Sequence, residues 1–123
     1  MPRKAVVVDD DKVTIDILTA ILTAAGFQVF SEDDGISGLE TVIREKPDLV
    51  ITDLLIPRLD GFGVCAKIKA DIELSHVRLV IMTALQNFVF LNEARNCGAD
   101  LILEKPISRE KLQAALERFF HPD

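Results

Sequence analysis

Residues 5–18, AVVVDDDKVTIDIL, are the stretch that decides the fold of this chain. A short apolar run without polar alternation, such as Ala5–Val8, is typical of a β-strand that helices cover on both faces. A helical pattern follows, with Asp11 as a suitable N-cap and Gly26 as a suitable stop. The apolar residues of this predicted helix form one stripe: Val13, Ile17, Leu18, Ile21 and Leu22. The stretch therefore predicts a strand, an acidic junction and a helix.

The same strand-then-helix pattern recurs along the rest of the chain. Four further apolar runs predict strands at Phe27–Phe30, Leu49–Thr52, Val77–Met82 and Leu101–Leu103. The predicted helices after them contain Leu39, Val42 and Ile43 (ending before Pro47), then Gly61–Ala70, then Asn87–Asn96 (stopping near Gly98), and finally Leu112, Ala115, Leu116 and Phe119 behind a Ser108 cap. Five such units predict an α/β fold, a doubly wound five-stranded parallel sheet with helices on both faces.

Composition limits the class of protein. The 123 residues suffice for a single domain, residues 1–123, and are 49% hydrophobic and 28% charged. No apolar run approaches the roughly 20 residues of a membrane helix, so we expect neither secretion nor a membrane partner. The net charge of −6 argues against direct nucleic-acid binding. Cys65 and Cys97 lack the spacing of a disulfide framework or a metal site, which predicts small packing residues and a cytoplasmic protein.

Polar residues gather where the predicted strands end. Asp9 and Asp10 follow the first strand, Asp53 the third, Thr83 the fourth and Lys105 the fifth. In open parallel sheets, ligands bind beyond the carboxyl ends of the strands. We therefore predict one site that contains all five residues, although each alone could serve as a helix cap or a surface residue.

The chemistry of this set points to phosphoryl transfer. Two carboxylates about 4 Å apart repel by on the order of 4 kcal/mol at an effective dielectric of about 20, so Asp9, Asp10 and Asp53 require a cation or a proton. Hard oxygen ligands favour Mg²⁺, which also accepts phosphate oxygens. Lys105 adds a second positive charge and Thr83 a hydroxyl donor. Such a site can neutralise a phosphoryl group while a carboxylate attacks it, which gives an aspartyl-phosphate.

These motifs, in this order, resemble the receiver domains of two-component response regulators over essentially the whole chain. The motifs are Val8-Asp9-Asp10, Asp53 with Pro57 four residues on, Asp60-Gly61, Thr83-Ala84, Gly98-Ala99-Asp100 and Lys105-Pro106. The resemblance implies the flavodoxin-like strand order 2-1-3-4-5. It also implies a receiver domain with no output domain in residues 1–123.

The resemblance implies a phosphoacceptor and a metal site. Asp53 would take a phosphoryl group from a phosphohistidine on a sensor histidine kinase or a phosphotransfer protein. Asp10 and Asp53 would bind Mg²⁺ directly, Asp9 largely through water, and Leu55 through its backbone carbonyl. The protein would thereby assist its own phosphorylation and dephosphorylation without being a turnover enzyme on a separate substrate.

The resemblance also implies phosphate-binding groups. Lys105 would pair with the phosphate, and the Thr83 hydroxyl and the Ala84 backbone N–H would hydrogen-bond to its oxygens. The Lys105–Pro106 peptide bond would be cis, for which the penalty before proline is only about 0.5–1 kcal/mol.

Three features depart from the usual receiver pattern. Ile102 stands at the switch position, where an aromatic residue is usual, so the readout through the surface of the fourth helix, fifth strand and fifth helix is altered. Four consecutive apolar residues, Phe88, Val89, Phe90 and Leu91, cannot all face the core from one helix. Phe88, Phe90 and Leu91 are candidates for a surface that binds a downstream partner or a second copy of the chain, and we expect either a monomer or a phosphorylation-dependent dimer. Apolar Leu55 and Leu85 beside the site predict slow self-dephosphorylation.

Two alternative functions stay open at this point. Asp9-x-Asp11 also fits the opening motif of haloacid-dehalogenase-like phosphohydrolases, with Asp9 as nucleophile, Asp11 as general acid/base, and Thr52 or Thr83 with Lys105 as phosphate binders. The absence of an acidic pair after Lys105 and of room for a cap insertion counts against it. The second alternative is a receiver-like binding module that is never phosphorylated.

Overall fold

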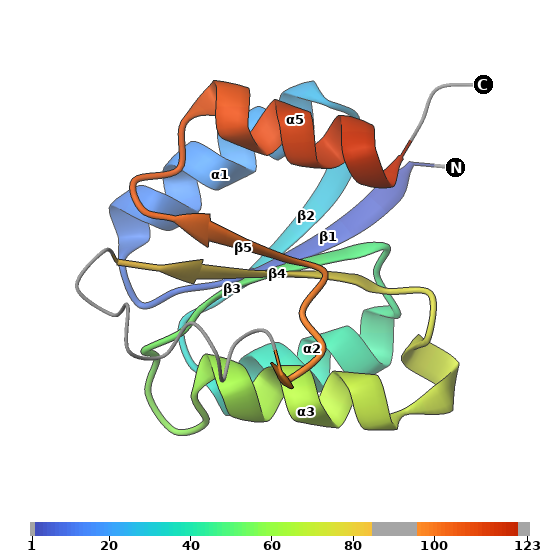
Figure 1. Ribbon diagram of the computed structural model, residues 1–123. Helices are drawn as coiled ribbons and strands as arrows, with labels where there is room; N and C mark the ends of the chain where they lie inside the picture. The colour runs from blue at the N-terminus through green and yellow to red at the C-terminus, as the bar shows by residue number, and fades with distance from the viewer. Residues whose placement is uncertain (1, 85–95, 121–123) are drawn as a thin grey trace.

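A five-stranded parallel sheet lies between two layers of helices in the computed structural model, which describes residues 2–84 and 96–120 (Figure 1). The strands are β1 (Arg3–Val8), β2 (Phe27–Glu32), β3 (Leu49–Asp53), β4 (Arg78–Thr83) and β5 (Leu101–Glu104). Neighbouring strands pair in parallel in the order β2-β1-β3-β4-β5. Both the fold class and the expected strand order 2-1-3-4-5 are confirmed.

Helices cover both faces of the sheet (Figure 1). On one face lie α1 (Lys12–Ala24) and α5 (Arg109–Phe119). On the other lie α2 (Gly35–Glu45) and α3 (Gly61–Ala70), and the short 3-10 helix η1 (Ile72–Leu74) follows α3. The helix predicted at Asn87–Asn96 lies outside the described residues apart from its last position.

The core consists of two apolar clusters, one on each face of the sheet. Successive β1 residues alternate between them: Ala5 and Val7 pack toward α1 and α5, whereas Val6 and Val8 pack toward α2 and α3. Because side chains of a strand point alternately to its two faces, a strand buried on both faces must be apolar throughout. This explains why the apolar runs show no polar alternation.

An aspartate or a serine caps each described α-helix. The N-cap side chains accept a hydrogen bond from a backbone N–H in the first turn, which satisfies a donor that the helix leaves unpaired. The four caps are Asp11, Asp34, Asp60 and Ser108. The predicted caps Asp11 and Ser108 are therefore confirmed, and α3 has the predicted bounds.

The predicted apolar stripe of α1 is wrong at its first two members. Leu18 is fully buried, whereas Val13 is 64% exposed and Ile17 is 48% exposed. At about 100° per residue, Val13 and Ile17 lie roughly 100–140° around the helix from Leu18. They therefore fall outside the face that contacts the sheet, and α1 has more apolar surface than the core covers.

In the described part of the chain, no helix has the length and apolar character to cross a membrane.

Candidate functional site

The parallel sheet places the predicted site residues at one edge. Asp53 and Thr83 are the last residues of β3 and β4, Asp9 directly follows β1, and Lys105 directly follows β5. The strand registers align these ends, with Val8 opposite Thr52 and Thr83 opposite Glu104. Residues from four strands thus come together because the strands end together.

The Lys105 ammonium joins two carboxylates from different strands. Its Nζ lies 2.8 Å from Asp9 Oδ2 and 3.1 Å from Asp53 Oδ2. The Asp9 side chain is fully buried, and the other two side chains are mostly buried. Charge-assisted hydrogen bonds of this kind are stronger than neutral ones, particularly away from solvent. Lys105 therefore offsets part of the negative charge that the acidic residues accumulate.

Burial and hydrogen bonding shift the pKa values of Asp9 and Lys105. Desolvation by burial raises the pKa of Asp9, against the hydrogen bonds from Lys105 and the Asp11 backbone, which lower it. Desolvation acts to lower the pKa of Lys105, but hydrogen bonds to Asp9 and Asp53 outweigh it, so that pKa lies above its ordinary value. Lys105 therefore remains a cation at neutral pH.

Asp11 supports the site through its backbone and caps α1 through its side chain. Its backbone N–H donates to Asp9 Oδ1 at 2.9 Å. Its carboxylate accepts from the Thr14 hydroxyl at 2.8 Å and the Val13 backbone N–H at 3.2 Å. The Thr14 hydroxyl is the main cause that lowers the pKa of Asp11. The sequence predicted only the cap, since the bond to Asp9 depends on how the chain turns after β1.

The acidic cluster fits a hard divalent cation. Asp9, Asp10 and Asp53 each offer a carboxylate oxygen, and these oxygens lie within 4.8 Å of one another. In an octahedral Mg²⁺ site with bonds of about 2.1 Å, neighbouring ligands lie about 3 Å apart and opposite ligands about 4 Å apart, so the three oxygens would move closer together to bind one ion. An all-oxygen donor set with exposed Asp10 at its rim is suited to Mg²⁺ that keeps several waters.

Thr83 ends β4, next to the strand that ends at Asp53. The Thr83 hydroxyl donates to the Ala84 carbonyl at 3.3 Å, while the Thr83 carbonyl accepts from the Lys105 backbone N–H at 2.8 Å. Ile102 in β5 is half-buried and packs on the α2–α3 side of the core. Leu55 is 56% exposed. Leu85, Phe88, Phe90 and Leu91 lie outside the described residues.

The loop after Asp53 is held against the start of α2, a contact that was not predicted from the sequence. The Gly35 backbone N–H donates to the Pro57 carbonyl at 3.0 Å, and a Cβ at Gly35 would lie 1.7 Å from the Leu59 carbonyl oxygen. Arg58, with a φ of 72°, places its guanidinium 3.3 Å from Asp34. This contact joins segments that are more than 20 positions apart in sequence, so no local pattern predicts it.

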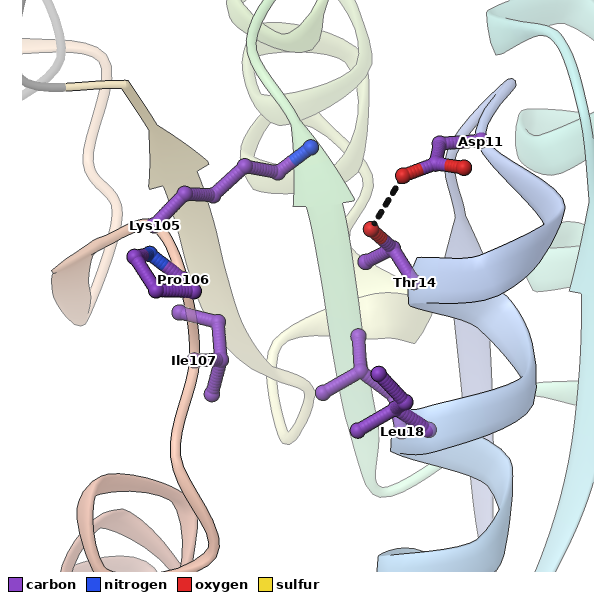
Figure 2. A pocket seen from close by; sticks show the side chains of 7 residues that line it. Asp11, Thr14, Leu18, Lys105, Pro106 and Ile107 are labelled. Carbon is purple, nitrogen blue, oxygen red and sulfur yellow. Dashed lines mark hydrogen bonds between the residues drawn. The ribbon is translucent and has the colours of Figure 1, made fainter.

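A cavity of about 350 Å³ lies beside Lys105, between α1 and the connection from β5 to α5. Figure 2 shows Asp11, the N-cap of α1, and Thr14 and Leu18 of α1 across from Lys105, Pro106 and Ile107; Ile17 completes the lining. The Lys105–Pro106 peptide bond is cis. No local sequence pattern predicts this cavity, because its two walls are more than 80 residues apart in the chain.

The geometry does not support the phosphohydrolase alternative. Asp9, its nucleophile, is fully buried, whereas Asp53, which is likewise bonded to Lys105 and to a backbone N–H, is partly exposed. Asp11, its general acid/base, has both carboxylate oxygens in bonds that cap α1. Asp9 is therefore not placed to attack a separate substrate.

Comparisons with known sequences agree with one family. The model of the response regulator receiver domain matches residues 5–117. DNA-binding dual master transcriptional regulator RpaA of Synechocystis sp. is 33% identical over 93% of this chain and 47% of its own length. Sporulation initiation phosphotransferase F of Bacillus subtilis is 29% identical over 97% of this chain and 94% of its own. The chain spans about half the length of the first curated relatives it matches.

Solved structures share the same fold. The receiver domain of sensor histidine kinase PA1611 from Pseudomonas aeruginosa, with a magnesium ion coordinated in its active site cleft, superposes with a TM-score of 0.87. It is 26% identical, and the match covers 97% of this chain and 98% of that one. From the strand order, the acidic edge and the match over residues 5–117, we conclude that the chain belongs to the response regulator receiver domain family.

Proposed function

We propose that this chain accepts a phosphoryl group on Asp53 from a phosphohistidine of a histidine kinase or phosphotransfer protein. The observation that carries the proposal is the position of Asp53. Its carboxylate lies 3.1 Å from the Lys105 ammonium and within the acidic cluster, and its side chain is partly exposed. Asp9 is fully buried, so Asp53 is the Lys105-bonded carboxylate that an incoming phosphoryl group can reach.

The transfer follows from the groups around Asp53. One carboxylate oxygen attacks phosphorus as the bond from phosphorus to the imidazole nitrogen breaks, and the nitrogen keeps the electron pair. The product is a mixed carboxylic-phosphoric anhydride on Asp53. Lys105 would offset the charge of the phosphoryl oxygens, and the Thr83 hydroxyl and Ala84 backbone N–H would hydrogen-bond to them.

The acidic residues complete the proposed site. Asp10 and Asp53 would bind Mg²⁺ directly, the Leu55 backbone carbonyl would add a ligand, and Asp9 would act largely through water. When bound, Mg²⁺ supplies charge neutralisation at the phosphoryl oxygens. Buried Asp9 also fixes the Lys105 ammonium at 2.8 Å, which orients that cation toward Asp53.

Phosphorylation would change the bonds of this edge. It adds about −1.5 to −2 charges beside an ammonium that is now shared by two carboxylates. Lys105 would move toward the new anion and Thr83 would turn its hydroxyl away from the Ala84 carbonyl. We propose that this rearrangement switches binding of a downstream protein.

The exposed apolar residues of α1 suit the phosphodonor protein. Ile17 is exposed and lines the cavity together with Lys105 and Pro106, and Val13, four residues earlier on α1, is also exposed. Apolar surface therefore lies beside Lys105, which contacts the proposed phosphoacceptor Asp53. A helical segment that presents a phosphohistidine to Asp53 would cover this surface. Burial of apolar area at that contact would contribute to donor affinity.

The proposal is tested by incubating the chain with a small acyl phosphate and Mg²⁺ and recording its intact mass. Wild type should gain one phosphoryl group. Asp53→Ala should gain none, and Asp16→Ala, an exposed aspartate of α1 outside the site, should behave as wild type. Phosphorylation of Asp53→Ala would overturn the assignment. Turnover of a phosphoester that Asp9→Ala abolishes would favour the phosphohydrolase, and no reaction would favour a pure binding module.

A further inference from the structure

The fold brings together the two cysteines, which are 32 positions apart in sequence. Cys65 lies in α3 and is fully buried, and its thiol donates to the Cys97 carbonyl at 3.0 Å. Cys97 is only half-buried and packs against the same apolar cluster. The sulfur of Cys65 is therefore held against the backbone of Cys97.

The two side chains are also adjacent. Burial is the largest cause that raises the pKa of the Cys65 thiol, and a hydrogen bond with the Cys97 side chain is the next. Cys97 is partly exposed and Cys65 is fully buried, so Cys97 is the cysteine that lies nearer to solvent. The pair thus has the arrangement of an attacking and a resolving thiol.

The geometry points to a reversible disulfide between Cys65 and Cys97, formed with a peroxide as oxidant; nothing in the proposed phosphorylation requires it. The Cys97 thiolate attacks one oxygen of hydrogen peroxide, the O–O bond breaks, and hydroxide leaves and is protonated to water. Cys65 then loses its proton and attacks the Cys97 sulfenic acid, the S–O bond breaks, and the second oxygen leaves as water. Two thiols and one peroxide give one disulfide and two waters, and a dithiol reductant reverses the reaction.

The bond would connect α3 to the segment that leads into β5. The ring it closes, residues 65–97, contains β4, which ends in Thr83, and the chain after the ring continues through β5 to Lys105. A closed ring limits the conformations of the unfolded chain and so favours the folded state. The oxidised protein should unfold at a higher temperature than the reduced protein, by on the order of 10 °C.

The experiment treats the reduced, folded full chain with hydrogen peroxide and records the intact mass and the peptides released by non-reducing digestion. We expect the mass of two hydrogen atoms to be lost, a Cys65–Cys97 linked peptide to appear, and a dithiol to restore both. Cys97→Ser should remain monomeric and unlinked. Asp53→Ala, which removes the proposed phosphoacceptor, should form the disulfide as wild type does.

Two results would overturn the inference. One is oxygen added to Cys97, or two chains joined through Cys97, while Cys65 stays a thiol. The other is a linked peptide that forms only when the chain is first unfolded in urea. Cys65→Ala should carry its oxidation on Cys97 alone; should that variant fail to fold, the peptide map of the wild-type chain decides the question by itself.

Discussion

The Lys105 ammonium, 2.8 Å from Asp9 and 3.1 Å from Asp53, is the residue-scale feature that holds the proposed site together. It offsets only part of the charge of three carboxylates, because Asp10 adds a third carboxylate to the cluster. The cluster therefore has a net negative charge that a divalent cation can neutralise. Because of this net negative charge, binding of Mg²⁺ should raise the free energy of unfolding.

Asp10→Asn should reduce the stabilisation of the fold by Mg²⁺ without lowering the stability of the metal-free protein. With Mg²⁺ at about ten times its Kd, wild type should gain about 1.4 kcal/mol in free energy of unfolding. Asp10→Asn removes one ligand charge, so the variant should lose most of this Mg²⁺-dependent gain. Without Mg²⁺ the variant should be at least as stable as wild type, because one of the mutually repelling carboxylates has been neutralised. Thermal unfolding with and without Mg²⁺ measures both effects. Asp16→Asn should respond as wild type does, and an unchanged Mg²⁺ response in Asp10→Asn would remove Asp10 from the metal site.

Leu55 should set the lifetime of the phosphoryl group. Its exposed apolar side chain, two residues after Asp53, has no group to orient an attacking water. We expect the phosphorylated chain to lose its phosphoryl group over minutes or longer, and Leu55→Asn to lose it several-fold faster. Loss of the added phosphoryl mass with time, in Mg²⁺ and without phosphodonor, measures the rate. A wild-type lifetime of seconds would contradict this prediction.

The elements explain which features could be predicted from sequence. The five strands were predicted within one or two residues of their ends, since buried strands are short apolar runs, and the site followed because parallel strands end together. The exposure of Val13 and Ile17 was not predicted, because helical periodicity gives an apolar face but not how much of it the sheet covers. The Gly35 contact with Leu59 was also missed, since it joins separate elements.

Ile17 in α1 should affect the rate of phosphoryl transfer from a donor protein but not the rate from a small acyl phosphate. Ile17→Asp places a charge on apolar surface beside the cavity, so it should slow transfer from a histidine-phosphorylated donor protein about tenfold or more. Phosphorylation by a small acyl phosphate should stay unchanged. Parallel time courses with both donors test this, with Ile72→Asp on the distant α3–η1 side as the control. Equal slowing with both donors would mean that the substitution perturbs the site itself.

Asp34 at the start of α2 should make stability depend on pH. Hydrogen bonds, the largest from the Ser37 backbone N–H, lower its pKa from the ordinary 3.8. A lowered folded-state pKa stabilises the fold above the unfolded value, and that contribution is lost as the pH falls through the folded value.

Two substitutions distinguish the contribution of the Asp34 charge to stability from the contribution of its helix-capping hydrogen bonds. Asp34→Ala should lower the unfolding midpoint at neutral pH by about 3–6 °C. Asp34→Asn keeps a capping oxygen, so its difference from wild type should be smaller and should shrink as the pH drops below 3.8. Thermal unfolding of the three proteins between acidic and neutral pH measures this; a difference that grows on acidification would contradict the sign.

At the scale of the whole molecule, the sheet brings residues 9, 53 and 105 to one edge, although 96 positions separate the first from the last. The alternation of strands and helices predicted an α/β sandwich, but the strand order 2-1-3-4-5 came from resemblance to a family. Many strand orders satisfy the same alternation, and the order depends on pairings between distant segments. The cavity beside Lys105 depends on the same distant packing.

Chemical mapping of the phosphorylated residue tests the central claim most directly. Borohydride reduces an aspartyl-phosphate to homoserine, so the chain is incubated with an acyl phosphate and Mg²⁺, reduced, digested and sequenced by mass spectrometry. We expect homoserine at position 53 and aspartate at positions 9 and 10. Homoserine at position 9 or 10, with aspartate intact at 53, would contradict the claim.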